Sequence, residues 1–210
     1  MSFHTHPMTF TLVGINVIIH ALIFYILNSL YFNVNLILFK LSLNPEAIIM
    51  AHEWWRMFTS MFVHSSLLHL LANMMALLIF SHIMEPILGS KRFLMIYLAG
   101  GLIANLIALC YVGYFAIPNY MAIGASGAVL AILGAALAFF RFVSQRDIEK
   151  QKIMAAKQML SRMLVILLLQ IIADMFSAQS SFIHHITGLI TGFICTHILL
   201  TDQYSDHSAK

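Results

Sequence analysis

Six long apolar stretches constrain the fold of this 210-residue chain more than any other feature. A bilayer-spanning α-helix needs roughly 17–25 such residues. The stretches that meet this length are residues 9–30, 65–84, 93–114, 126–142, 159–177 and 182–200. Backbone polar groups inside lipid must be paired within the chain, and a helix pairs them locally. The sequence therefore predicts an all-α polytopic membrane protein with six transmembrane helices.

Composition excludes a soluble globular domain. Charged residues make up 9% of the chain and hydrophobic residues 61%, whereas soluble domains carry about 25% charged residues. Cys110 and Cys195 both lie inside apolar stretches, so no disulfide framework is expected. The start of the chain lacks the basic region of a cleaved signal peptide, and the first stretch is predicted to be retained. Without an internal repeat or a soluble segment, residues 1–210 are expected to form a single membrane domain.

The long connection between the first two spans, residues 31–64, is not a clean membrane span. It mixes asparagines with apolar residues and ends in His52-Glu53-Trp54-Trp55-Arg56. Paired tryptophans beside an arginine suit the lipid headgroup region, so this connection is predicted to be partly helical and to lie in the membrane surface. The same five residues begin like a zinc-protease helix, but Arg56 stands where a second histidine is required, and no metal site is expected.

Basic residues in the connections predict the orientation. The third and fifth connections hold no Lys or Arg, whereas the second and fourth are basic: Lys91, Arg92, Arg141, Arg146, Lys150, Lys152, Lys157 and Arg162. The positive-inside rule then places both termini in the cytoplasm and the first, third and fifth connections outside. The basic fourth connection is interpreted as a topology signal, not as a nucleic-acid site. Spans two, four and six all start on the outer side.

Polar residues gather near the outer ends of these three spans. His69 and Asn73 share one face of the second span, Ser126 starts the fourth, and His185 lies in the first turn of the sixth. Polar groups within a membrane are costly and usually functional. A lone serine is more often a packing residue, but these four residues are expected at one depth. We therefore predict that they form one site in the outer half of the membrane.

The small residues of the sixth span predict how this site is assembled. Gly188 and Gly192 form a face that lets another helix approach closely, and the fourth span offers a complementary face of Gly127, Ala131, Gly134 and Ala135. Contact along these faces would bring Ser126 beside His185. Such a pair is a minimal activated nucleophile. The Ser126 N–H, His69 and Asn73 are then candidate donors to an oxyanion.

These motifs, taken in order, resemble rhomboid intramembrane serine proteases of the six-helix bacterial type. The resemblance runs from about residue 50 to 200 and rests on Trp55-Arg56, His64, His69-xxx-Asn73, Gly124-x-Ser126-Gly127 and His185-xx-Gly188-xxx-Gly192. It implies a Ser126–His185 dyad, with His69, Asn73 and the Ser126 amide at the oxyanion. It also implies cleavage of other membrane proteins near the outer ends of their transmembrane segments, in a bacterial inner membrane, without metal or cofactor.

One position departs from that family, which usually has a small residue where this chain has His184. Counting back from the glycines assigns the catalytic role to His185, so His184→Ala is expected to leave activity largely intact. The connection 178–184 and the region of Phe176 are the expected gate elements.

Three other functions are compatible with a polytopic membrane protein. A catalytically silent relative that binds membrane clients is the alternative, but such relatives generally lose the serine or the histidine. A transporter would show repeat symmetry. An intramembrane aspartyl protease would need two aspartates within spans, and Asp174 is the only one there.

Overall fold

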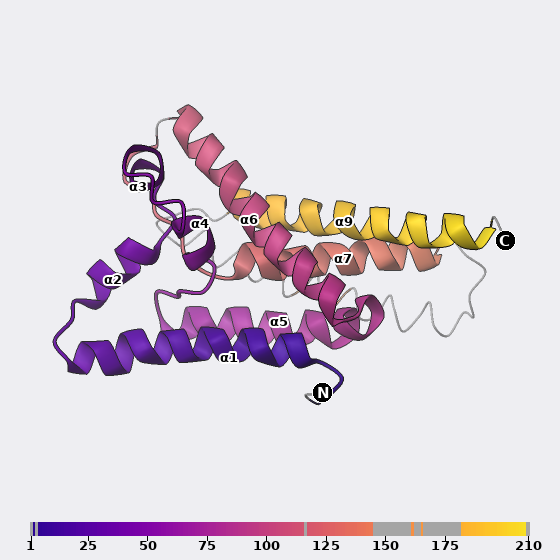
Figure 1. The fold of residues 1–210 in the computed structure, drawn as a ribbon, viewed down its shortest axis with the longest axis horizontal. Coiled ribbons are helices and arrows are strands. Elements are labelled where there is room, and N and C mark those ends of the chain that lie inside the picture. Colours follow the sequence, from indigo (N-terminus) through magenta and orange to yellow (C-terminus); the bar gives the residue numbers. More distant parts are fainter. Residues whose placement is uncertain are drawn as a thin grey trace.

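Long helices dominate the fold, as the amino-acid sequence predicts (Figure 1). The computed structural model describes residues 2, 4–115, 117–144, 161, 165 and 182–208. Within these residues, helices long and apolar enough to cross a membrane cover Pro7–Leu27, Leu67–Leu88, Ser90–Phe115, Ser126–Ser144 and Phe182–Asp202. They agree with five of the six predicted spans, which confirms an all-α polytopic membrane protein. Of the remaining predicted span, 159–177, the structure describes only residues 161 and 165.

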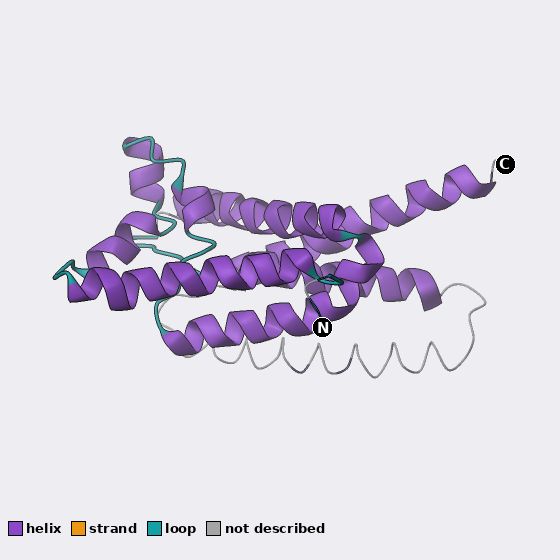
Figure 2. Ribbon diagram, turned by 60° about the horizontal axis from the view of Figure 1, so that its bottom comes forward, coloured by secondary structure: helices purple, strands orange, loops and turns teal. Residues whose placement is uncertain are grey.

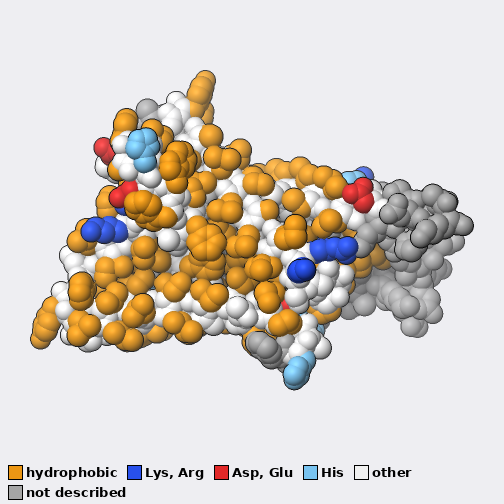
Figure 3. Space-filling view, viewed as in Figure 1, with side chains coloured by type: hydrophobic (Ala, Val, Ile, Leu, Met, Phe, Trp, Pro, Cys, Tyr) orange, Lys and Arg blue, Asp and Glu red, His pale blue; other side chains and the backbone are white. Residues whose placement is uncertain are grey.

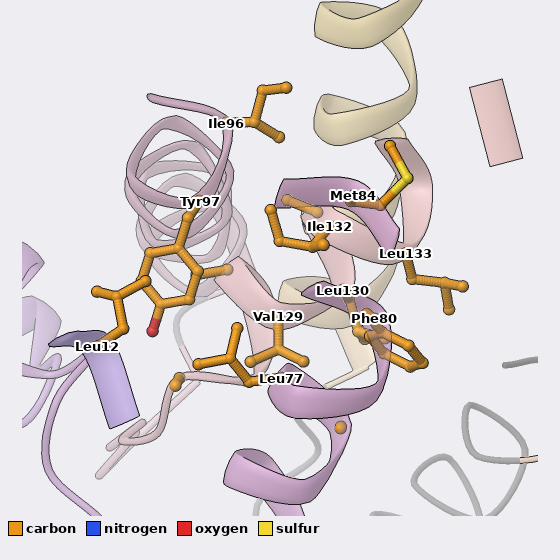
Figure 4. Packing of buried hydrophobic residues seen from close by; sticks show 14 of the residues in the cluster. Leu12, Leu77, Phe80, Met84, Ile96, Tyr97, Val129, Leu130, Ile132 and Leu133 are labelled. Carbon is orange, nitrogen blue, oxygen red and sulfur yellow. The ribbon is translucent and has the colours of Figure 1, made fainter. Parts of the chain in front are cut away.

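Helix α7 (Ser126–Ser144) is the centre of the bundle. Its residues from Ser126 to Ala136 are all buried, as expected of a helix that is apolar on every side. Helices α5 (Leu67–Leu88), α6 (Ser90–Phe115) and α9 (Phe182–Ser208) pack around it. Figure 4 shows Leu130 of α7 beside Phe80 of α5, with Tyr97 of α6 on the other side of the same cluster. The surrounding helices therefore hold α7 within the protein.

The contact between α7 and α9 is made by backbone. A Cβ added at Gly188 would lie 2.1 Å from the Gly127 carbonyl oxygen, and one at Gly192 would lie 1.8 Å from the Ala131 carbonyl oxygen. Only glycine allows such an approach. The predicted packing of the sixth span on the fourth is thereby confirmed.

Helix α1 (Pro7–Ala21), which continues as the π-helix η1 (Leu22–Leu27), packs against α5. Glu85, which lies near the end of α5, holds the start of α1 in place. The buried carboxylate of Glu85 accepts hydrogen bonds from the backbone N–H groups of Met8 and Thr9, from the Thr9 hydroxyl and from the Ser90 hydroxyl. A carboxylate at a helix N-terminus satisfies N–H groups that have no partner within the helix.

The first connection contains three short helices, α2 (Val34–Leu41), α3 (Pro45–Met50) and α4 (Arg56–Thr59). This confirms the prediction that the connection is partly helical. Arg56 is buried and organises it, because its guanidinium binds the Glu53 carboxylate and the carbonyl oxygens of Phe39 and Ser42.

These short helices and most of the loops gather at one end of the long helices (Figure 2). Helices α5, α7 and α9 all begin at this end (Figure 1). On the face drawn in Figure 3, hydrophobic side chains cover the middle, while Lys, Arg, Asp and Glu lie toward the two ends. This distribution suits a protein whose middle is surrounded by lipid.

Candidate active site

Ser126 is the first residue of α7 and is 7% exposed. The loop that leads to it is fixed by two sets of backbone hydrogen bonds. Leu43 and Ala122 form an antiparallel bridge, with N···O distances of 2.8 and 3.1 Å, and the Gly124 N–H donates to the Ser60 carbonyl at 2.8 Å. The first N–H groups of a helix have no partner within that helix. Ser126 therefore combines a hydroxyl with the anion-stabilising end of α7.

Gly124 is required by both its conformation and its neighbour. Its φ of +122° lies in a region that other residues rarely adopt. A Cβ there would lie 2.9 Å from both Cε1 and Nε2 of His69. The His69 imidazole consequently lies against the backbone two residues before Ser126, so the structure brings these two predicted site residues to one place.

His64 supports His69 from the first connection. The two rings meet edge to face with their centroids 5.0 Å apart. His64 is 1% exposed, and burial, together with the nearby His69 and His20, lowers its pKa to about 3. A neutral imidazole is therefore packed against His69 at neutral pH. On its other side, His69 Nδ1 lies 3.2 Å from the Ser65 hydroxyl.

Asn73 lies one turn further along α5 and is fully buried. Its Nδ2 donates to the His69 carbonyl oxygen at 3.0 Å. This bond uses one N–H of the amide and leaves the second for another acceptor. The structure thus places Asn73 one turn from His69 on the same helix face, as predicted. One of the two N–H groups of the Asn73 amide is used within α5.

The first turn of α9 carries His184 and His185, which are 6% and 3% exposed. This turn packs on the start of α7, where a Cβ at Gly127 would lie 3.6 Å from the His184 carbonyl oxygen. Of the two histidines, it is His184 that lines a small cavity beside Ser126. The structure therefore brings both histidines to the start of α7 and turns His184 toward the cavity.

The cavity has a volume of ≈ 10 Å³, enough for about one water molecule. Its polar lining comes from Ser60, Asn105, Ser126 and His184. Asn105 of α6 donates to the Met57 carbonyl oxygen at 2.7 Å and to the Ser60 hydroxyl at 3.0 Å. Sequence analysis missed Asn105, although a lone amide within an apolar span is itself a signal of a functional or structural role.

Tyr120, in the loop before Ser126, was also missed. Its ring is parallel to that of His184, with an interplanar angle of 3° and centroids 6.2 Å apart, and its hydroxyl lies 3.1 Å from His184 Nδ1. No motif includes Tyr120, so no sequence signal marks it. Asp174, Phe176 and residues 178–181 of the expected gate lie outside the described residues.

Residues 51–202 match the rhomboid domain family. The chain belongs to the rhomboid family. It is 29% identical to YdcA of Bacillus subtilis over 148 residues, which are 70% of this chain and 67% of that protein. It is 30% identical to rhomboid protease GluP of Bacillus subtilis over 154 residues, 73% of this chain and 28% of that protein.

A third relative is the human presenilin-associated rhomboid-like protein, mitochondrial, which is 39% identical over 93 residues, 44% of this chain and 23% of that protein. The similarity thus covers about two-thirds of one relative and less than a third of the other two. The residues that match the rhomboid domain family include His69, Asn73, Ser126, His184 and His185.

Proposed function

We propose that this rhomboid is an intramembrane serine endopeptidase that cleaves other membrane proteins in or near their transmembrane segments. The observation that carries the proposal is the close contact of Gly127 with Gly188, which sets the first turn of α9 beside Ser126. A nucleophile and a histidine base on two helices need such a contact, because proton transfer requires hydrogen-bond distance. Belonging to a family whose members include a named protease supports it further.

In this mechanism the Ser126 hydroxyl attacks the scissile carbonyl carbon and transfers its proton to His185. The C–N bond then breaks, and His185 gives that proton to the leaving amine, which leaves an acyl group on Ser126. A water molecule next attacks the acyl carbon, gives one proton to His185, and releases the carboxylic acid as that proton returns to the Ser126 oxygen. No metal or cofactor takes part.

Three groups are proposed to stabilise the oxyanion formed in each step. The Ser126 N–H belongs to the helix end described above, His69 lies over Gly124, and Asn73 keeps one N–H available. Loss of one such donor slows catalysis about 10²–10³-fold in well-studied hydrolases. We expect a loss within that range for His69→Ala.

The substrate is proposed to be a transmembrane helix that enters from the bilayer and unwinds near its outer end. Exposed backbone is costly in lipid, so helix-weakening residues near the cut favour cleavage. We further propose a single domain over residues 1–210, cytoplasmic termini, an outward-facing site and a bacterial inner membrane as its location. The loop charges support this orientation.

A fluorophosphonate probe on detergent-purified protein tests the proposal. The wild type should be labelled at Ser126, Ser126→Ala should not be labelled, and His185→Ala should be labelled much more slowly. The matched control is Ser81→Ala, because Ser81 is a fully buried serine of α5 that donates to the Leu77 carbonyl oxygen. Equal labelling of wild type and Ser126→Ala would refute the dyad, and an unlabelled wild type would favour a silent, client-binding rhomboid.

A further inference from the structure

The contact between Tyr120 and His184 joins the loop before Ser126 to the first turn of α9. Among the described residues, no other side-chain hydrogen bond joins these two segments. Tyr120 belongs to the loop before Ser126, and His184 belongs to the first turn of α9. Both a stacked ring pair and a hydrogen bond of 3.1 Å hold them together. The position of His185, the next residue, depends on how this first turn is rotated about the helix axis.

Tyr120 is itself held from the opposite side. The Asn44 amide donates to the Tyr120 carbonyl oxygen at 3.4 Å, and two residues later Ala122 pairs with Leu43. The first connection therefore fixes the backbone of Tyr120, while its side chain reaches α9. Through this one residue the first connection, the loop before Ser126 and α9 are joined.

The chemistry of the pair favours one arrangement of protons. Burial raises the pKa of the Tyr120 hydroxyl, so it stays protonated. A phenol O–H is a better donor than an imidazole N–H, and an imidazole nitrogen is a better acceptor than a phenol oxygen. Tyr120 therefore donates to Nδ1, and the ring proton lies on Nε2. Nε2 has no hydrogen-bond partner among the described residues, and His184 lines the cavity that it shares with Ser126.

We propose that His184 is a positioning residue, which through its Nδ1 bond to Tyr120 sets the rotation of the first turn of α9 and so aligns His185 with Ser126. This inference rests on the proposed function. It replaces the expectation from sequence that His184→Ala leaves activity largely intact. His184 thus has a positioning role that a small residue at this position could not perform.

Four variants test the role of the Nδ1 bond: His184→Ala, His184→Asn, His184→Gln and Tyr120→Phe. The asparagine Oδ1 stands close to the place of Nδ1 and can accept from Tyr120, whereas the polar end of glutamine lies nearer the place of Nε2. Errors of about 1 Å in alignment slow catalysis up to about 10²-fold. We expect kcat for a transmembrane substrate to fall at least about tenfold in the alanine, glutamine and phenylalanine variants, with KM nearly unchanged. The asparagine variant should keep most of its activity.

The labelling rate of Ser126 should follow the same order, and the double variant Tyr120→Phe/His184→Ala should be no slower than His184→Ala alone. Tyr114→Phe is the matched control, because Tyr114 is 83% exposed on α6 and should behave as wild type. Thermal unfolding in detergent separates misalignment from unfolding. Should His184→Ala fail to fold, Tyr120→Phe decides alone, because it keeps the stacked ring and removes only the hydroxyl.

Failure of the inference and failure of the proposed function give different results. A wild type that is not labelled at Ser126 refutes the protease and the positioning role together. A labelled wild type with full kcat in Tyr120→Phe, or with equal activity in His184→Asn and His184→Gln, overturns the positioning role and leaves the protease intact.

Discussion

The contact of Gly188 with Gly127 allows a quantitative test of how tightly the site is built. In Gly188→Ala the new Cβ would lie 2.1 Å from the Gly127 carbonyl oxygen and 3.1 Å from the Gly127 Cα, whereas Cβ contacts shorter than 3.0 Å essentially do not occur. The blocking atoms are backbone, so no side chain can rotate away. The start of α9 must therefore move from α7 by about 0.9 Å, directly beside Ser126.

Two effects follow from this displacement. Alignment errors of about 1 Å slow catalysis about 10²-fold, and overpacking of a well-packed core typically destabilises by about 1–3 kcal/mol. Alanine favours a helix interior over glycine by about 1 kcal/mol, which offsets only part of the second effect. We expect Gly188→Ala to label at Ser126 about 100-fold more slowly than wild type and to unfold at a lower temperature.

Gly113→Ala is the matched control for the same change of residue. Gly113 lies in α6, and a Cβ there would meet no atom within 4 Å. This variant should label at the wild-type rate and unfold at the same or a slightly higher temperature, because only helix propensity changes. If Gly188→Ala labels within about threefold of the wild-type rate and is equally stable, alignment is less sensitive than argued above and the reasoning fails.

Three further predictions concern other contacts. In Gly124→Ala, an alanine must adopt a φ of +122° and its Cβ must press against the His69 ring. Single-turnover acylation should therefore slow at least about tenfold. An unchanged rate would contradict the placement of His69. Glu85→Gln removes the charge that binds the start of α1, which should lower the free energy of unfolding by about 1–3 kcal/mol, measured by thermal unfolding. Ser126 should still be labelled at low temperature, because Glu85 lies at the end of α5 away from the site. The pKa of His64 is about 3 in the folded protein, against an ordinary value of 6.5. Between these two pH values His64 is protonated only in the unfolded chain. Stability therefore falls as the pH drops below about 6.5, by up to about 1.4 kcal/mol per pH unit. In His64→Asn the unfolding temperature should depend less on pH between 5 and 7.5, and an identical dependence would argue against a buried neutral His64.

The helices and their closest contact were predictable from sequence because each depends on local patterns. Long apolar stretches determine the spans, and the glycines at positions 188 and 192 predict the approach of α9 to α7. Helix α5 continues beyond the apolar stretch 65–84 to Leu88 and includes Glu85 and Pro86. The Glu85 carboxylate is paired with the start of α1, and apolar length alone does not predict such a tertiary contact.

The cavity beside Ser126 was not predictable for a related reason. Adjacent residues on a helix point about 100° apart, so the part of the site that His184 faces and the part that His185 faces both depend on the rotation of the first turn of α9. In the proposal above that rotation depends on Tyr120, which lies in a loop without a sequence pattern. Asn105 depends likewise on the course of the first connection around Ser60.

The bridge between Leu43 and Ala122 has a mechanical consequence. Leu43 follows α2, whose exposed Phe39 lies at the surface of the first connection, and Ala122 lies four residues before Ser126. Because the two backbones share hydrogen bonds, any displacement of this connection that leaves them intact also moves the loop before Ser126. A force applied to the first connection is thus transmitted through these hydrogen bonds to the loop that leads to Ser126, the proposed nucleophile.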